Sequence, residues 1–314
     1  MSSLQAPKAV VMIRPWRFHP NPETADDNAF QRESPHPETA VAARAREEFD
    51  RMVEILQSHG VRVHVFDDYG EHETPDSVFP NNWFSTHPGG HVAIYPMYSP
   101  SRRRERRNDV LNMLKSEYRV QDIIDLSGLE WDDLFLEGTG AMVLDHFERV
   151  AYTANSFRAN PIVLERFSSH FHFEPMAFDA ADRTGKPVYH TNVMMTIGTD
   201  FALVASRMIA DENRRKEVVR RLEDSGRMIV DLNFDQIENF AGNALELTGT
   251  AGRILVLSQR AYDALTPQQI GTIEPLARLV PLSVPTIELA GGSVRCMLAG
   301  IHLTRRSSET AGPH

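Results

Sequence analysis

The sequence predicts an α/β fold of five similar units arranged as a fivefold propeller, each unit with two antiparallel strands, a helix and a third strand. Strand, turn and helix patterns recur in one order along the chain. The recurrence has a period of roughly 50 residues, which is typical of radial arrays. The fragments left over at the two ends complement each other, and pairing strands from both termini would remove exposed sheet edges.

The N-terminal fragment is a strand at 9–15, a long helix at about 37–58 and a strand at 61–66. Four continuous units follow, and alternating apolar residues predict their strands. Their expected elements are strands 83–87 and 91–97, a helix from Arg102 and strand 121–125; strands 141–145 and 149–155, helix 160–168 and strand 171–178; strands 193–198 and 200–206, helix 211–225 and strand 227–232; strands 244–249 and 253–258, a helix from Pro267 and strand 279–284. The last strand, 296–303, lacks a partner and would complete the N-terminal fragment.

Composition excludes several classes of protein. The formal net charge of −10 repels a phosphate backbone, so a nucleic-acid partner is not expected. The one basic cluster, 101–107, is interpreted as the solvated face of a helix. No apolar run approaches the roughly 18 residues that span a bilayer. A single cysteine excludes an internal disulfide and fits a reducing compartment, so a cytoplasmic protein is expected. We expect one domain over residues 1–314, with a disordered tail at 307–314.

Five chemically distinctive residues occupy the same position in the five units. Asn82, Glu137, His190, Asn243 and Cys296 each open the first strand of a unit, and they are spaced 53 to 55 residues apart. Equivalent positions in a closed ring of units meet around its axis. The spacing therefore predicts that the lone thiol, a histidine, a carboxylate and two amides face one another across a central cavity.

This grouping changes the interpretation of Cys296. A lone buried cysteine mostly behaves as a small apolar side chain. A histidine held by a carboxylate, however, is the usual arrangement that activates a nucleophile. The pattern therefore favours a catalytic thiol.

Several motifs resemble the amidinotransferase or guanidino-group-modifying superfamily, whose members share a fivefold α/β propeller. They are "LEGTG" around Glu137, "HTN" at His190, "ENFAGNALEL" around Asn243 and the terminal "GGSVRC". The sequence "FPNNWFSTH" at 79–87 also resembles the citrulline-utilisation hydrolase-like branch.

The resemblance implies roles for particular residues. Cys296 matches the nucleophile, His190 the general acid and base, and Glu137 the carboxylate that contacts the substrate's nitrogens and helps to orient the site. Two family positions that usually hold aspartates gripping a guanidinium fall on Asn82 and Asn192.

Asparagine at these positions favours a neutral substrate. A guanidinium carries only donors and a positive charge, so carboxylates are its natural partners. A ureido group presents a carbonyl acceptor beside its N–H donors. The side chain of asparagine has both a donor and an acceptor, so it can pair with both kinds of group. We therefore expect a cysteine hydrolase of C–N bonds that converts citrulline to ornithine, ammonia and carbon dioxide. A deiminase of arginine or dimethylarginine, and a propeller that binds an amino acid or protein without turnover, stay open as alternatives.

An amino-acid substrate also needs partners for its charged ends. Arg158 and Arg14 are candidates for its carboxylate, because arginine binds carboxylates in a bidentate manner. Asn243 is a further candidate substrate contact. The polar loop 21–32 is longer than a plain connection, so it is expected to form a wall over the substrate.

No other ligand is expected. The proposed chemistry needs neither a metal nor an organic cofactor, and "HFHFE" at 170–174 is interpreted as exposed alternate residues of a strand rather than metal ligands. The expected partner is a small amino acid, and self-association into a homo-oligomer is left open.

Overall fold

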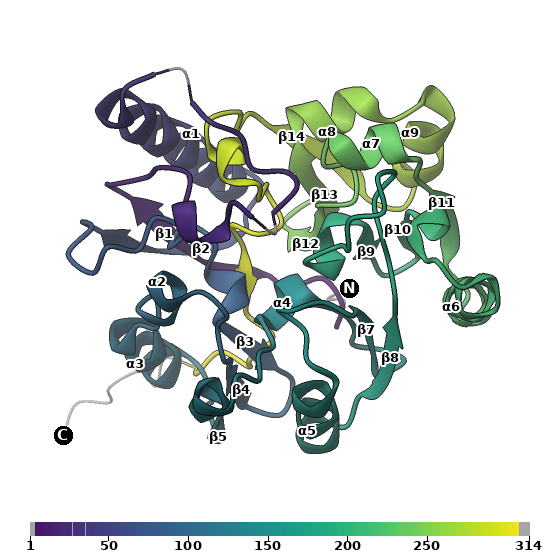
Figure 1. The fold of residues 1–314 in the computed structure, drawn as a ribbon, viewed down its shortest axis with the longest axis horizontal. Helices are drawn as coiled ribbons and strands as arrows, with labels where there is room; N and C mark the ends of the chain where they lie inside the picture. The colour runs from purple at the N-terminus through teal and green to yellow at the C-terminus, as the bar shows by residue number, and fades with distance from the viewer. Residues whose placement is uncertain (1–3, 27, 35, 308–314) are drawn as a thin grey trace.

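The chain folds into five small three-stranded sheets with the longer helices outside them (Figure 1). The computed structural model describes residues 4–26, 28–34 and 36–307. Residues 308–314 of the predicted tail lie outside the described part. Among the described residues, no helix is long and apolar enough to cross a membrane.

All five sheets share one pattern, which confirms the repeated unit predicted from the sequence. In each sheet the central strand pairs antiparallel with one neighbour and parallel with the other. The strands are β1 (Ala9–Pro15) and β2 (Arg62–Asp68) with β15 (Ala299–Gly300); β3 (Phe84–His87), β4 (His91–Ile94) and β5 (Asp122–Asp125); β6 (Met142–Asp145), β7 (Val150–Ala154) and β8 (Glu174–Phe178); β9 (Met195–Ile197), β10 (Phe201–Val204) and β11 (Met228–Asp231); β12 (Leu245–Gly249), β13 (Gly252–Ser258) and β14 (Arg278–Leu282).

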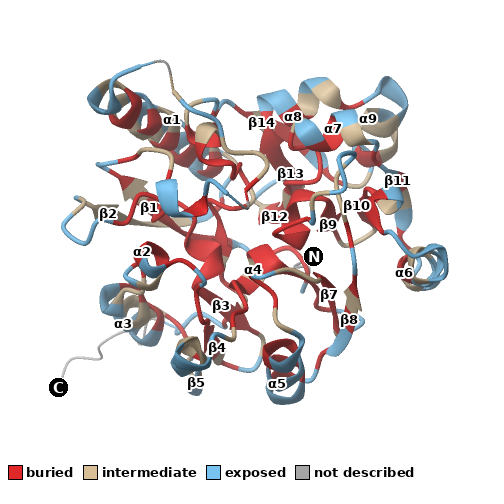
Figure 2. Ribbon diagram, in the orientation of Figure 1, coloured by how far each residue is buried: buried red, intermediate tan, exposed pale blue. Residues whose placement is uncertain are grey.

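Helical segments connect the parallel strands, because a parallel pair needs a crossover. The α-helices are α1 (Glu38–Ser58), α2 (Pro100–Arg103), α3 (Asn108–Glu117), α4 (Gly138–Ala141), α5 (Pro161–Phe171), α6 (Glu212–Asp224), α7 (Phe234–Glu238), α8 (Gln259–Ala264) and α9 (Pro267–Ile273). Short 3₁₀ helices are η1 (Pro22–Thr24), η2 (Pro80–Asn82), η3 (Ser127–Asp132), η4 (Thr191–Val193), η5 (Ser206–Met208) and η6 (Ile287–Ala290). Figure 2 shows buried residues concentrated on the strands and exposed residues on the outer helices.

The two ends of the chain share one sheet, as the leftover fragments predict. Val10 of β1 pairs with Gly300 of β15, and β1 runs parallel to β2 over its whole length. Strand β15 is much shorter than the predicted strand 296–303, since the residues around Cys296 form turns.

Two expectations about local structure are wrong. The helix predicted from Arg102 is two helices, α2 and α3, and Arg102 itself is buried rather than part of a solvated face. Helix α5 continues to Phe171 and ends where His172 adopts a left-handed conformation, so 170–174 is not a continuous strand.

A buried ion pair joins the end of β6 to the residue before β11. Arg227 donates to both carboxylate oxygens of Asp145 at 2.6 and 3.0 Å, and both side chains are almost fully buried. Removing one partner would leave an uncompensated buried charge.

We therefore expect Arg227→Met to lower the free energy of unfolding by about 3–5 kcal/mol. Chemical denaturation measures the change. The matched control is Lys216→Met, because Lys216 forms an exposed pair with Glu212 and should cost less than about 1 kcal/mol. Equal losses in the two variants would contradict the expectation.

Candidate active site

The five equivalent residues lie just before the first strand of each unit rather than at its opening. Asn82 ends η2, Glu137 precedes α4, and His190 precedes η4. Asn243 and Cys296 lie in the turns before β12 and β15. All five are buried. The structure brings them into contact in part: Asn243 donates to the sulfur of Cys296, and Glu137 bonds His190, although each strand begins later than expected.

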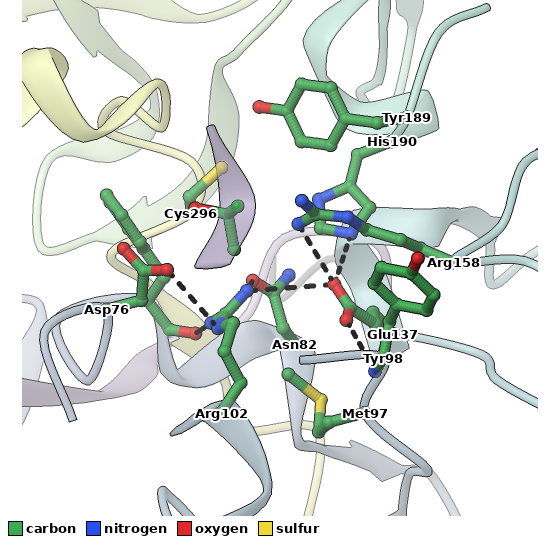
Figure 3. Close-up of polar contacts among 12 residues, drawn as sticks. Asp76, Asn82, Met97, Tyr98, Arg102, Glu137, Arg158, Tyr189, His190 and Cys296 are labelled. Atoms are coloured by element: carbon green, nitrogen blue, oxygen red, sulfur yellow. Dashed lines mark hydrogen bonds and ion pairs between the residues drawn. The ribbon is translucent and has the colours of Figure 1, made fainter. Parts of the chain in front are cut away.

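Three of these five equivalent residues, Asn82, His190 and Cys296, line one small pocket. In Figure 3, Cys296 and His190 approach it from different sides. The lining residues are Thr24, Asn28, Asp76, Phe79, Asn82, Arg102, Arg158, Tyr189, His190, Ala290, Gly292 and Cys296. Thr24 and Asn28 belong to the loop 21–32, as predicted, whereas Asp27 of that loop lies outside the described residues.

Two amides donate hydrogen bonds to the sulfur of Cys296. Asn192 Nδ2 lies 3.4 Å from Sγ, and Asn243 Nδ2 lies 3.3 Å from it. The backbone N–H of Arg295 donates to Asn243 Oδ1, which fixes the amide with its NH₂ group toward the sulfur. N–H donors of this kind stabilise negative charge on a thiolate.

Neither Asn192 nor Asn243 is among the residues that line the pocket. In the structure both amides contact the sulfur, and the substrate contacts predicted for them stay predictions.

Glu137 fixes the proton position on His190. His190 Nε2 lies 2.8 Å from Glu137 Oε2, and an ionised carboxylate can only accept, so Nε2 carries the hydrogen. Nδ1 is then the nitrogen with a free lone pair. Burial lowers the pKa of His190 from its ordinary value, and the hydrogen bond and charge of Glu137 offset only part of this effect.

The carboxylate of Glu137 is fully engaged by the protein. Its Oε1 accepts from the backbone N–H of Tyr98, and its Oε2 lies 3.5 Å from Arg158 and 3.7 Å from Arg102 (Figure 3). Burial raises the pKa of Glu137, but the charge of Arg158, the hydrogen bond with His190 and the charge of Arg102 outweigh it and hold the pKa far below its usual value. Glu137 does not line the pocket. It therefore orients His190, and the predicted contact with substrate nitrogens stays a prediction.

Arg102 fixes the orientation of the Asn82 amide. Its Nη1 donates to Asn82 Oδ1 at 2.8 Å. Because a guanidinium has no acceptor, this contact identifies the oxygen of the amide and leaves Nδ2 as its other end. Nδ2 is buried and has no partner among the described residues. Glu105 holds Arg102 in place through two contacts, at 2.9 and 3.0 Å.

Asp76 is the carboxylate that lines the pocket. Its Oδ2 accepts from Asn21 at 2.9 Å and lies 3.9 Å from Arg102, while its buried Oδ1 has no partner among the described residues. Burial raises the pKa of Asp76, and the charge of Arg102 and the hydrogen bond from Asn21 oppose this.

Of the two predicted arginines, the structure brings only Arg158 to the pocket. Its guanidinium lies 5.0 Å from the centre of the Tyr189 ring, and its side chain is buried. Arg14 is instead engaged by Asp50 and Asp67 in a partly exposed ion-pair cluster away from the pocket. In the sequence, an arginine that binds substrate and an arginine in a surface ion pair look alike near the end of a strand. Only the fold distinguishes these two roles.

Sequence reasoning missed Asp76, Arg102 and Tyr189. Arg102 was grouped with the exposed basic cluster, although Glu105 three residues later marks the inward side of that segment. Tyr189, which donates to the carbonyl of Gly291 at 2.7 Å, directly precedes His190 and could have been noticed there. Asp76 lies in an irregular segment without any such signal.

The charge of Glu137 has a measurable effect on His190. Replacing it in Glu137→Gln keeps a carbonyl acceptor for Nε2 but removes the negative charge that raises the pKa of His190. The pKa of His190 should therefore fall further below its ordinary value, because Arg158 and Arg102 then act on it unopposed. An NMR titration of the imidazole measures this shift, and a rise in that pKa would contradict the arrangement.

Comparisons with known proteins agree with the fold. A family model described as N,N dimethylarginine dimethylhydrolase, eukaryotic, matches residues 14–303. The N-terminal domain of ArgZ, an arginine dihydrolase from the ornithine–ammonia cycle in cyanobacteria, has a TM-score of 0.72 at 16% identity, over 93% of this chain and 97% of that one. A comparison with curated protein sequences gives no significant match.

Two further solved structures resemble this fold. Unliganded AgrE has a TM-score of 0.74 at 16% identity, and the match covers 96% of this chain but 40% of AgrE. A dimethylarginine dimethylaminohydrolase in an adduct with S-methyl-L-thiocitrulline has a TM-score of 0.63 at 14% identity, over 96% of this chain and 100% of that one. Since the family model spans most of the sequence, the chain belongs to the N,N-dimethylarginine dimethylhydrolase family of guanidino-modifying hydrolases.

Proposed function

We propose that this protein hydrolyses the ureido group of a free amino acid, with citrulline as the first candidate and ornithine, ammonia and carbon dioxide as products. The proposal includes the closed fivefold ring of units, which would bring the five equivalent residues around one axis. The observation that carries it is the orientation of Asn82, a residue that lines the pocket and whose Nδ2 has no partner among the described residues.

An N–H donor at this position suits a carbonyl oxygen. A ureido group offers that oxygen as an acceptor, whereas a guanidinium offers only N–H groups, which would face Asn82 Nδ2 donor to donor. Glu137 cannot compensate a guanidinium charge fully, because two arginines and a histidine already engage its carboxylate. A neutral ureido group therefore leaves fewer buried polar groups unpaired.

The rest of the pocket suits the charged end of an amino acid. The unpartnered Oδ1 of Asp76 can accept from an ammonium group, and the guanidinium of Arg158 can bind a carboxylate. ArgZ and AgrE, which are similar in fold, have been solved with substrate and with ornithine or L-arginine.

The geometry supports a two-stage reaction. The proton of the Cys296 thiol passes to His190 Nδ1, and the thiolate attacks the ureido carbon. The electron pair of the carbonyl moves to its oxygen, which Asn82 Nδ2 stabilises by a hydrogen bond. The bond from the carbon to the substituted nitrogen then breaks, and that nitrogen takes the proton from His190. Ornithine leaves, and a carbamoyl group remains on the sulfur.

Water completes the reaction in the second stage. His190 takes a proton from water as the resulting hydroxide attacks the carbamoyl carbon. The carbon–sulfur bond breaks, its electrons return to Cys296, and carbamate leaves and decomposes to ammonia and carbon dioxide. Hydrogen bonds from Asn192 and Asn243 stabilise the thiolate as the leaving group.

Hydrolysis of a guanidino group is the second candidate. Asp76 favours it, because its unpartnered oxygen could instead accept from the N–H groups of a guanidinium. Release of ammonia from arginine would then leave a ureido product.

Parallel assays with citrulline and arginine test the proposal. We expect ornithine to form directly from citrulline, with little turnover of arginine. Asn82→Asp should shift the ratio of kcat/KM toward arginine by at least about tenfold, because a carboxylate pairs with a guanidinium. Cys296→Ala is the control and should form no product. Faster conversion of arginine than citrulline by the unchanged protein would support the second candidate, and turnover of neither would indicate a binding protein.

Gly140 provides a second test, because it packs against two of the reacting groups. A Cβ at this position would lie 2.2 Å from Asn82 Nδ2 and 2.8 Å from His190 Nδ1, so both side chains would have to move. We expect Gly140→Ala to lower kcat/KM by about 100-fold, which is typical when catalytic groups are displaced by about 1 Å. Gly271→Ala is the control, since its Cβ would meet no atom within 4 Å. Equal activity in both variants would contradict the proposed roles.

A further inference from the structure

A second cavity lies close to Cys296 but does not belong to the pocket described above. Its volume is about 50 Å³, and it shares none of its lining residues with that pocket. Arg295 lines this cavity, while Cys296, the next residue, lines the pocket. The cavity therefore lies directly behind the turn that carries the thiol.

Arg295 brings a positive charge into this cavity without an opposite charge. Its Nη1 donates to the carbonyl oxygen of Leu298 at 2.9 Å, and no carboxylate among the described residues forms an ion pair with it. None of the lining residues is an aspartate or a glutamate. Burial lowers the pKa of Arg295 to about 10, an effect that only the neighbouring Cys296 opposes. A cation in such surroundings favours a negatively charged ligand.

His146 adds an unpartnered polar atom to the lining. Its side chain is 6% exposed, and its Nδ1 has no hydrogen-bond partner among the described residues. Its ring packs against that of His302, with centroids 4.0 Å apart, and His302 Nδ1 lies 3.1 Å from the carbonyl oxygen of Leu4. Buried polar atoms nearly always have a partner, so an unpartnered one in a cavity indicates a bound molecule.

We propose that this cavity binds a small oxyanion, with Arg295 as its counter-charge and His146 as a hydrogen-bond donor. Inorganic phosphate, bicarbonate and a small carboxylate share the required chemistry of negative oxygens. Ser85, Thr86 and Thr139 also line the cavity, and their side chains add no charge that would repel such a ligand.

Binding there should reduce the reactivity of Cys296, a consequence that rests on the proposed nucleophile. The guanidinium of Arg295 is a positive charge on the residue next to Cys296, and its backbone N–H positions the Asn243 amide that donates to the sulfur. An anion beside the guanidinium would neutralise that charge without entering the substrate pocket. The anion should therefore lower kcat without competing with substrate.

Calorimetric titration of the whole chain with inorganic phosphate tests the site itself. We expect binding, with an affinity at least about tenfold weaker in Arg295→Gln. His146→Phe keeps a ring against His302 but removes the donor, so it should weaken binding while leaving activity without phosphate unchanged. Thermal unfolding of each variant verifies that it is folded.

Arg158→Gln is the matched control, because Arg158 lies in the other pocket and its loss should leave phosphate binding intact. No binding at up to about 10 mM phosphate would overturn the proposal. Binding that is lost in Arg158→Gln but kept in Arg295→Gln would also overturn it, since the anion would then occupy the substrate pocket.

The rate of Cys296 alkylation by iodoacetamide tests the coupling separately from turnover. Phosphate should slow alkylation in the unchanged protein and not in Arg295→Gln. An equal effect in both proteins would overturn the coupling. Because calorimetry and alkylation need no substrate, they remain decisive even if neither citrulline nor arginine is hydrolysed.

Discussion

The buried carboxylate of Glu137 is the constraint on which the rest of the site depends. A buried charge without partners costs several kcal/mol, so the fold must bring compensating groups to it. His190, Arg158 and the backbone N–H of Tyr98 come from three separate segments to do so. The same contacts select the tautomer of His190 and hold its ring beside Asn82. The cost of burying one charge thus determines the geometry of His190 and its neighbours in the candidate site.

Amides serve two purposes around this carboxylate. Asn192 and Asn243 direct their NH₂ groups to the sulfur, while Arg102 turns the NH₂ group of Asn82 away from itself. A side-chain amide can present either its oxygen or its NH₂ group to a ligand. A neighbour that can only donate binds the oxygen and so leaves the NH₂ group for the ligand. Under the proposed function, selectivity between ureido and guanidino groups would depend on Arg102, a charged residue that need not touch the reacting carbon.

Much of the fold and part of the site could be predicted from the sequence. The regular spacing of Asn82, His190 and Cys296 predicts a shared pocket, because repetition of one unit carries equivalent residues to equivalent places. The burial of Arg102 could not be predicted, since its basic neighbours suggested a solvated helix. Nor could the sequence show that Arg14 pairs with Asp50, because that contact depends on how α1 lies against β1.

The sequence by itself determined the number and order of the units, the pairing of the two chain ends and the identities of the reactive side chains. These follow from local periodicity and from residue chemistry, and both depend only on the order of residues in the chain. Only the tertiary structure decided which atoms of those side chains remain available to a ligand. Hydrogen-bond satisfaction in a buried site depends on every neighbour at once, and the neighbours come from segments far apart in the chain.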